Sequence, residues 1–268
     1  MAKRLSKPGL GAALWAAAVM GWVGIALADV WDPIDQSAFA TANELVHGSD
    51  QIHELGPGND PDPGMRDVDF FKIGERPLSS YEVVVDGATN DIVDGLTLQR
   101  WSLTGPIHSS LPVSNFGRSR SLRWMNTLNS NLSSSYVRVG SLHACHSCSS
   151  AKASYHIRSY DTTYSIPRFN NSTTQITLLL VQNTSSRSVV AGAHFWSSTG
   201  TLLGTMTFGL TPKQLLVQNT ASLPFAAGAN GSITISHDGR YGDLSGKAVS
   251  LEPATGFTFD TTMEPRPR

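Results

Sequence analysis

The segment "TQITLLLVQNTSSRSVVAGAHFWSSTGTLLGTMTF", residues 174–208, decides the fold class. It holds three short runs rich in β-branched residues or leucine, and polar stretches with Ser, Asn or Gly separate them. Short apolar runs bounded by turn residues are typical of β-strands. "SSTG" at 197–200 predicts a hairpin turn, because Gly accepts the positive φ that such turns demand.

The same pattern continues on both sides of this segment. Towards the C-terminus it recurs in "KQLLVQNT", "GSITIS" and "KAVSLE", and "HDGR" at 237–240 predicts a second hairpin turn. Towards the N-terminus, "SYEVVVDG" places Tyr81, Val83 and Val85 on one face, and "SYVRVG" and "SYHIRSYD" also alternate. No long amphipathic helix is expected between these runs. The chain is therefore predicted to be all-β, built as sandwiches or barrels.

The string "LLVQNT" occurs twice, at 179–184 and at 215–220. One short match is thin evidence for a repeat architecture. We interpret the two strings as two strands of one sandwich that end in similar turns.

Two tandem β-sandwich domains are predicted. The boundary is expected near "YDTTYSIPRF", where polar residues and Pro167 interrupt the strand pattern. The first sandwich would span residues 41–161, after a linker at 29–40, and the second would span residues 162–262. "MEPRPR" at 263–268 is expected to be a polar tail with no core residue to dock it.

The N-terminus predicts export. Lys3, Arg4 and Lys7 precede an uncharged run, which ends at Ala26-Leu27-Ala28 with small residues where a signal peptidase reads. We predict a signal peptide over residues 1–28; an N-terminal membrane anchor is the alternative. The mature chain is expected to be secreted, periplasmic or on the cell surface, with no membrane span after cleavage.

The charge balance does not favour a nucleic-acid partner. The chain has 20 Lys and Arg against 21 Asp and Glu. Residues 1–28 hold three of the basic residues and none of the acidic ones, so the remainder carries a formal charge of −4. No basic patch points to nucleic acid, and we expect no nucleic-acid partner.

Four segments of the first half resemble a known family. "NELVHGSDQIHEL", "RDVDFFKI", "SYEVVVDG" and "YVRVGS" follow one another in this order. Over residues 41–161 they resemble the bacterial pre-peptidase C-terminal domain, and Asp67-Val68-Asp69-Phe70-Phe71 resembles that family's Asp-x-Asp-aromatic-aromatic strand. The resemblance implies a jelly-roll-like sandwich, non-catalytic, that aids secretion, surface attachment or substrate binding. No segment before it is large enough to be a peptidase. The second half resembles, more weakly, the immunoglobulin-like or fibronectin-like sandwiches of bacterial surface proteins.

The stretch "LHACHSCSS", residues 142–150, holds both cysteines, Cys145 and Cys148. Haem attachment would need His directly after the second cysteine, where Ser149 stands. A redox pair needs a helix N-terminus to lower the thiol pKa, whereas this stretch lies between two predicted strands. In an oxidising compartment we predict a disulfide between Cys145 and Cys148.

Two alternatives for this stretch stay open. Zinc is one, because His143 and His146 join the cysteines as suitable ligand types, although all four come from six consecutive residues. Free or redox-active thiols are the other.

An acidic loop, "GNDPDPGMRDVDFF" at 58–71, is the candidate metal site. Oxygen-rich loops bind calcium when several carboxylates converge, and extracellular calcium fills weak sites. The spacing does not match an EF-hand. The alternative is a solvated turn in which acidic residues cap the backbone or pair with Arg66 and Lys72. The candidate ligands are Asp60, Asp62, Asp67 and Asp69, and calcium is the one cofactor that the sequence suggests.

The sequence lacks the common catalytic motifs of hydrolases and dinucleotide-binding enzymes. There is no Gly-x-Ser-x-Gly elbow, no His-Glu-x-x-His and no Gly-rich dinucleotide loop. Histidines are scattered singly, so no motif organises a triad. They are His47, His53, His108, His156, His194 and His237.

Together these features favour an exported, non-catalytic binding or adhesion module of the bacterial envelope or exterior. Such a module could act as an accessory to a separate secreted enzyme. Its ligand would be glycan, protein or other cell-envelope material. Trp101, Trp124 and Trp196 could line a binding face, although strand tryptophans are usually core residues. An envelope hydrolase with an unrecognised catalytic site is the alternative.

Overall fold

The computed structural model describes residues 42–55, 68–89, 96–102, 105–108, 119–130, 132–141 and 153–265, without the side chains of 105–108, 132–134 and 141. Its secondary structure is almost entirely β, arranged in several sheets as a sandwich fold, so the predicted fold class is confirmed. The predicted signal peptide at 1–28 and the predicted linker at 29–40 lie outside these residues. Within them, no helix has the length and apolarity needed to cross a membrane.

The described residues of the first half form nine strands in two sheets. The sheet orders are β1-β3-β8-β5-β6 and β2-β9-β4-β7. Neighbours are antiparallel except β1 and β3, which are parallel. The strands are β1 (Asn43–Glu44), β2 (Asp50–Leu55), β3 (Asp69–Glu75), β4 (Ser79–Asp86), β5 (Leu96–Ser102), β6 (Gly105–His108), β7 (Arg120–Asn126), β8 (Leu132–Ser141) and β9 (Ala153–Asp161).

The second half also contains nine strands in two sheets. The orders are β13-β12-β15-β10-β18 and β14-β11-β16-β17, all antiparallel. One 3-10 turn, η2 (Thr220–Ser222), follows β14. The strands are β10 (Tyr164–Asn170), β11 (Ile176–Asn183), β12 (Val189–Ser197), β13 (Leu202–Leu210), β14 (Leu215–Asn219), β15 (Asn230–His237), β16 (Leu244–Glu252), β17 (Phe257–Thr262) and β18 (Glu264–Pro265).

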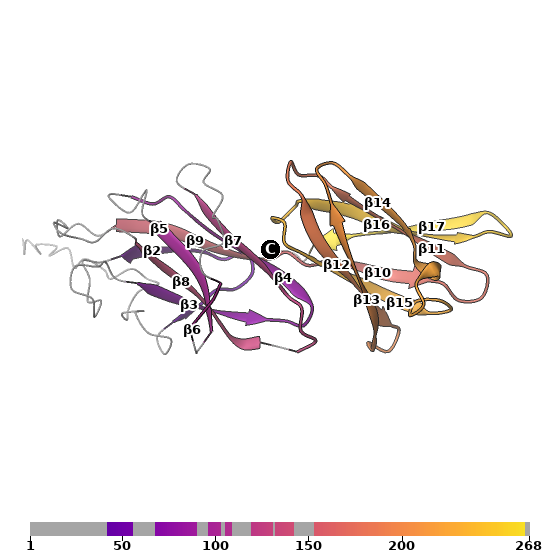
Figure 1. The fold of residues 1–268 in the computed structure, drawn as a ribbon, viewed down its shortest axis with the longest axis horizontal. Helices are drawn as coiled ribbons and strands as arrows, with labels where there is room; N and C mark the ends of the chain where they lie inside the picture. The colour runs from indigo at the N-terminus through magenta and orange to yellow at the C-terminus, as the bar shows by residue number, and fades with distance from the viewer. Residues whose placement is uncertain are drawn as a thin grey trace, which may run out of the picture.

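Each pair of sheets encloses its own apolar core, because inward-facing residues alternate with outward-facing ones. On β9, Tyr155 and Ile157 are fully buried while His156 and Arg158 are partly exposed. One core is drawn entirely from residues 45–157 and the other entirely from residues 164–263. Figure 1 shows the two sheet pairs as separate halves.

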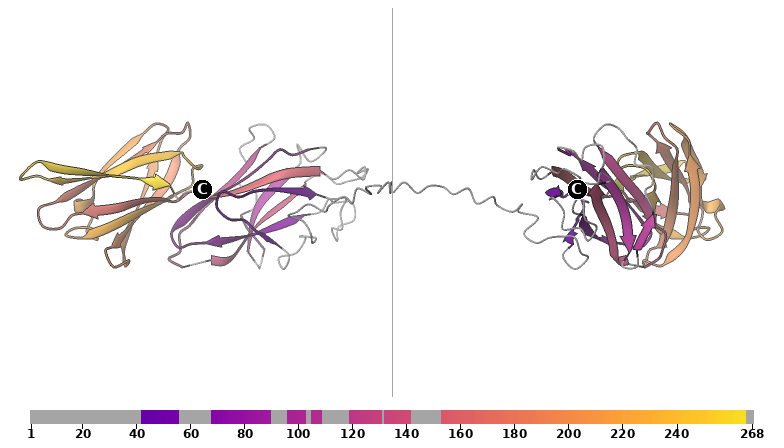
Figure 2. Two further views of the ribbon diagram at one scale, coloured as in Figure 1. Left: turned by 180° about the vertical axis from the view of Figure 1, so that it is seen from behind. Right: turned by 60° about the vertical axis from the view of Figure 1, so that its left-hand side comes forward.

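The two halves lie end to end (Figures 1 and 2). Hydrogen bonds join them at the junction. The connecting Thr162 N–H donates to the Ser80 carbonyl at 2.8 Å, and the Ser80 N–H donates to Thr163 Oγ1 at 2.9 Å. The Tyr241 N–H donates to the Glu82 carboxylate at 2.9 Å. These contacts bury the outer face of β4, where Ser80 is 0% and Glu82 is 4% exposed.

One predicted turn is confirmed and the other is wrong. "SSTG" joins the paired strands β12 and β13, with Gly200 at φ +81°. "HDGR" does not close a hairpin, because β15 and β16 belong to different sheets. The connection between them runs longer, and Gly242 rather than Gly239 takes the positive φ.

The two "LLVQNT" strings lie side by side in one sheet, on β11 and β14, with Leu180 opposite Val217. Each string ends in a similar turn. Asn183 Oδ1 accepts from the Ser185 N–H, and Asn219 Oδ1 accepts from the Ala221 N–H. The interpretation as two strands of one sandwich that end in similar turns is therefore confirmed.

The prediction of an undocked tail at 263–268 is wrong for its first residues. Met263 is 5% exposed and packs in the second core. β18 follows it and pairs with the start of β10. A single methionine between polar residues was enough to dock this segment, because the adjacent edge of β10 offered unpaired backbone groups.

Candidate functional site

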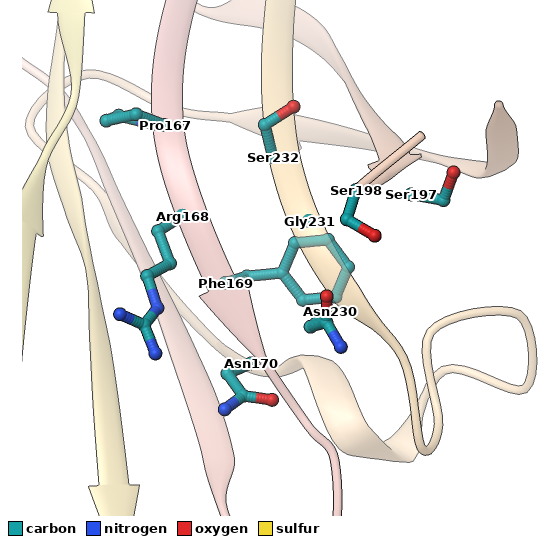
Figure 3. A pocket seen from close by; sticks show the side chains of 9 residues that line it. All are labelled: Pro167, Arg168, Phe169, Asn170, Ser197, Ser198, Asn230, Gly231 and Ser232. Atoms are coloured by element: carbon teal, nitrogen blue, oxygen red, sulfur yellow. The ribbon is translucent and has the colours of Figure 1, made fainter. Parts of the chain in front are cut away.

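The candidate site is a hollow of about 480 Å³ at one end of the second half. Its lining is mostly hydroxyl and amide side chains, with one guanidinium (Figure 3). The residues are Pro167, Arg168, Phe169, Asn170, Ser197, Ser198, Asn230, Gly231 and Ser232.

Strand direction places this hollow at the end of the second half that points away from the first half. We call it the distal hollow. β10 starts at the junction and runs outward to Asn170. β15 runs in the opposite direction, from Asn230 to His237, and His237 Nε2 lies 3.0 Å from the Thr162 carbonyl at the junction. β12 runs antiparallel to β15 and ends at Ser197. Three neighbouring strands therefore contribute their outer ends to one surface.

A local irregularity opens the hollow. The register between β10 and β15 shifts between Ile166 and Phe169, which leaves Pro167 and Arg168 exposed. Phe169 stays fully buried and packs edge-on against Phe195, with ring centroids 5.3 Å apart. Bulges of this kind re-aim side chains at the edge of a sheet.

Arg168 is the one charged residue of the lining. Its guanidinium lies 4.6 Å from the ring centroid of Phe259 on β17, a cation–π contact. In Figure 3 its side chain extends away from the ring of Phe169. The contact holds a positive charge beside the hollow.

The polar groups of the lining are held in place by neighbours. Asn170 Nδ2 donates to Gln175 Oε1 at 2.5 Å, and its Oδ1 accepts from the Ser172 N–H at 2.9 Å. Ser197 Oγ accepts from the Thr201 N–H at 3.1 Å. Such a surface can bind a polar ligand through hydrogen bonds, and Arg168 adds affinity for an anionic group.

Two further hollows lie near the junction. One of about 360 Å³ is lined by Arg187, Arg240, Asp243 and two serines. Burial lowers the pKa of nearby Arg123, and the charges of Arg240 and Arg187 lower it further against the opposing effect of Glu82. The other hollow, of about 180 Å³, is lined by residues around His47 and Asp161.

Three of the six histidines considered as catalytic candidates are buried and neutral at pH 7. Burial lowers the pKa of His53, His194 and His237 to about 4 in each case. His53 Nε2 lies 3.0 Å from Gln51 Oε1, and its ring packs against Phe71. These side chains fill cores and join strands.

The other three histidines are dispersed. His47 Nδ1 accepts from the Asp161 N–H at 2.8 Å. His156, on β9, is partly exposed and lies 3.4 Å from Asp50. His108 lies in β6, and its side chain is outside the described residues.

His194 and Ser236 form the arrangement nearest to a catalytic pair. His194 Nε2 lies 2.9 Å from Ser236 Oγ, and its Nδ1 lies 3.0 Å from Thr205 Oγ1. A nucleophile–base pair has this spacing, with a third group orienting the base. Ser236 is only 2% exposed, however, so a substrate carbonyl would not reach its hydroxyl without rearrangement.

The three tryptophans fall into different environments. Trp124 is a core residue at 4% exposure, stacked on Tyr81. Trp101 is partly buried and packs edge-on against Phe70. Trp196 is partly buried, and its Nε1 donates to Thr234 Oγ1 at 2.8 Å. They lie on β7, β5 and β12, and none lines the distal hollow.

The predicted metal and disulfide residues lie mostly outside the described part of the chain. This holds for Asp60, Asp62, Asp67, Cys145 and Cys148, with the alternative zinc ligands His143 and His146. Asp69 begins β3, is 1% exposed and accepts a hydrogen bond from the Tyr155 hydroxyl. In the described ranges, no three His, Cys, Asp or Glu residues gather as metal ligands would. The calcium and disulfide assignments stay predictions.

A buried ion pair in the first half was not expected from the sequence. Arg100 donates two hydrogen bonds to Glu75, at 2.7 and 2.8 Å, and their side chains are 7% and 0% exposed. Trp124 Nε1 donates to the same carboxylate at 2.9 Å. The three residues are far apart in sequence, so no local pattern could have joined them.

No family model matches the chain, and no curated protein matches it in sequence. The resemblance of residues 41–161 to pre-peptidase C-terminal domains therefore rests on the motifs that carry it. What the protein binds has to be inferred from its residues and their geometry.

Proposed function

We propose that the protein is an exported, non-catalytic binding or adhesion module of the bacterial envelope or exterior. The observation that carries the proposal is the distal hollow. It lies at the strand ends directed away from the first half, it is lined by hydroxyl and amide groups, and Arg168 stands at its edge. A ligand with several hydroxyls or an anionic group, such as an envelope glycan, matches this lining.

Two sequence features support an extracellular role. The predicted signal peptide at 1–28 would export the chain. The motifs over residues 41–161 resemble a module appended to secreted proteins. A module of this kind could also serve as an accessory to a separate secreted enzyme.

The proposal is tested by retention on isolated bacterial envelope. The exported protein is incubated with the envelope fraction of its host, and the bound share is measured after sedimentation. Ser198 is exposed at the hollow, so Ser198→Trp fills the hollow without disturbing the core. We expect this variant to bind about tenfold more weakly or worse.

The matched control is Ser188→Trp. Ser188 is also exposed, but it precedes β12 at the end of the strand opposite Ser197. This control should bind like the wild type. Equal retention of both variants and the wild type would remove the hollow as the binding site, and no retention of the wild type would overturn the proposed function.

The second candidate function is an envelope hydrolase, and the His194–Ser236 pair is the observation that favours it. It would require the sheet face to open and expose Ser236. Release of soluble fragments from envelope material by the wild type, and its loss in Ser236→Ala, would establish this function. Equal release, or none, would leave the pair as a cross-strand hydrogen bond.

A further inference from the structure

Among the residues that the structure describes, the four sheets end in eight edge strands, and two of these edges differ from the rest. Edge strands expose unpaired backbone groups, and proteins usually guard them with charged residues or proline. Six edges carry such a guard: Glu44 on β1, Asp50 and Glu54 on β2, Pro106 on β6, Arg120 and Arg123 on β7, Asp260 on β17, and Glu264 and Pro265 on β18. β13 and β14 carry neither.

β14 also exposes apolar side chains. Leu215 is 50% and Val217 is 57% exposed, and both lie on the outer face of their sheet. Leu216 points the other way and packs against the core. On β13, joined to β14 by a short turn, Met206 and Phe208 are only partly buried. This side of the second half therefore combines open backbone groups with uncovered apolar surface.

We propose that β14 is the docking edge for a second copy of this chain, which adds its own β14 antiparallel across a twofold axis. Two copies of an uncharged edge can meet without like-charge repulsion. At the six guarded edges, a twofold axis would bring a charge towards its own copy or place a proline in the ladder. The absence of charge on β14 thus favours its own copy as the partner.

The side chains select one register. Directly opposed residues in an antiparallel pair share a face of the sheet, so a twofold axis must pass through a residue and its copy. An axis at Leu216 places Leu215 opposite Val217 of the second copy, and Val217 opposite its Leu215. Both exposed apolar residues then gain cross-strand partners. An axis at Val217 would instead place Leu215 opposite Asn219.

The chain already contains a similar pairing. The other edge of β14 lies antiparallel to β11, which carries the same five residues, Leu-Leu-Val-Gln-Asn. The register of the β11–β14 pair differs by one residue from the register proposed for the two copies of β14. The reason is that the string on β11 buries its first and third residues, whereas the string on β14 partly buries its second. It shows that this string accepts an antiparallel neighbour of its own composition. The dimer would join two four-stranded sheets into one.

Sedimentation analysis of the exported protein tests the proposal. We expect a concentration-dependent dimer in the wild type. Val217→Lys places a charge opposite an apolar residue, so it should be monomeric up to ~100 µM. Ile52→Lys is the control, because Ile52 is also exposed, at 45%, on the edge strand β2; it should dimerise like the wild type.

Cross-linking tests the register in a background without Cys145 and Cys148. Leu215→Cys with Val217→Cys should form a covalent dimer under oxidation, because opposed residues have the separation that a disulfide needs. Leu215→Cys alone should not. A monomeric wild type, a dimer that survives Val217→Lys, or a wild type that binds only an extended peptide of another protein would each overturn the proposal.

Discussion

At the scale of single residues, the stability of the first half depends on a buried carboxylate, that of Glu75. The Glu75 carboxylate is fully buried and accepts from both Arg100 and Trp124. Glu75→Gln removes the negative charge and leaves the Arg100 guanidinium buried without a counter-charge, so we expect a loss of about 3–5 kcal/mol in the free energy of unfolding. Urea denaturation measures it. The exposed pair Lys247–Asp260 provides the control, because Asp260→Asn should cost less than about 1 kcal/mol.

The buried histidines predict sensitivity to acid. His53, His194 and His237 have folded-state pKa values near 4, against 6.5 when exposed. Between these pH values the unfolded chain binds more protons than the folded chain. The contribution of these histidines to the free energy of unfolding is therefore fully present above pH 6.5 and is lost as the pH falls towards 4. Each histidine accounts for about 3 kcal/mol of this loss. Denaturation measured from pH 7 to pH 4 should show it.

His194→Gln should make that pH dependence shallower, since one of the three proton-binding groups is removed. His156→Gln is the control, because the His156 side chain is 39% exposed. A pH profile unchanged by His194→Gln would contradict the assignment of this histidine as a buried neutral group.

At the scale of elements, the sequence predicted most strands of the second half and missed what depended on partners. Short apolar runs bounded by turn residues located β11 to β16, because such runs are typical of strands that pack on a core. The hairpin predicted at "HDGR" is wrong, because a turn motif does not reveal whether the flanking strands share a sheet. The distal hollow could not be foreseen, because it arises where a register shift in β10 meets the ends of two other strands.

Gly231, in the lining of the hollow, lies where β12 and β15 leave no room for a side chain. A Cβ built there would lie 1.8 Å from the Trp196 carbonyl oxygen, so the ends of β12 and β15 must separate to accept alanine. Gly231→Ala should cost about 1–3 kcal/mol or more and weaken envelope binding. Gly209→Ala, where no atom lies within 4 Å of the added Cβ, should change stability little. Similar melting temperatures for both variants would contradict this prediction.

At the scale of the whole molecule, the junction contacts orient the two halves. The Glu82 carboxylate accepts from Ser121 Oγ at 2.6 Å within the first half and from the Tyr241 N–H of the second. The same carboxylate therefore ties together a strand and a loop from different cores. This arrangement would hold the distal hollow at a fixed distance from the first half, as the proposed binding role requires.

The separate cores predict that the second half folds alone. Its core uses residues from Tyr164 to Met263, so a fragment of residues 162–268 should give an all-β circular dichroism spectrum and a cooperative melt. A fragment of residues 162–262, which ends at the boundary expected from sequence, loses Met263 and β18. Removing a buried methionine costs about 2–5 kcal/mol, so the shorter fragment should melt well below the longer one. Equal melting temperatures would show that β18 is dispensable, and an unfolded longer fragment would show that the second half needs the first.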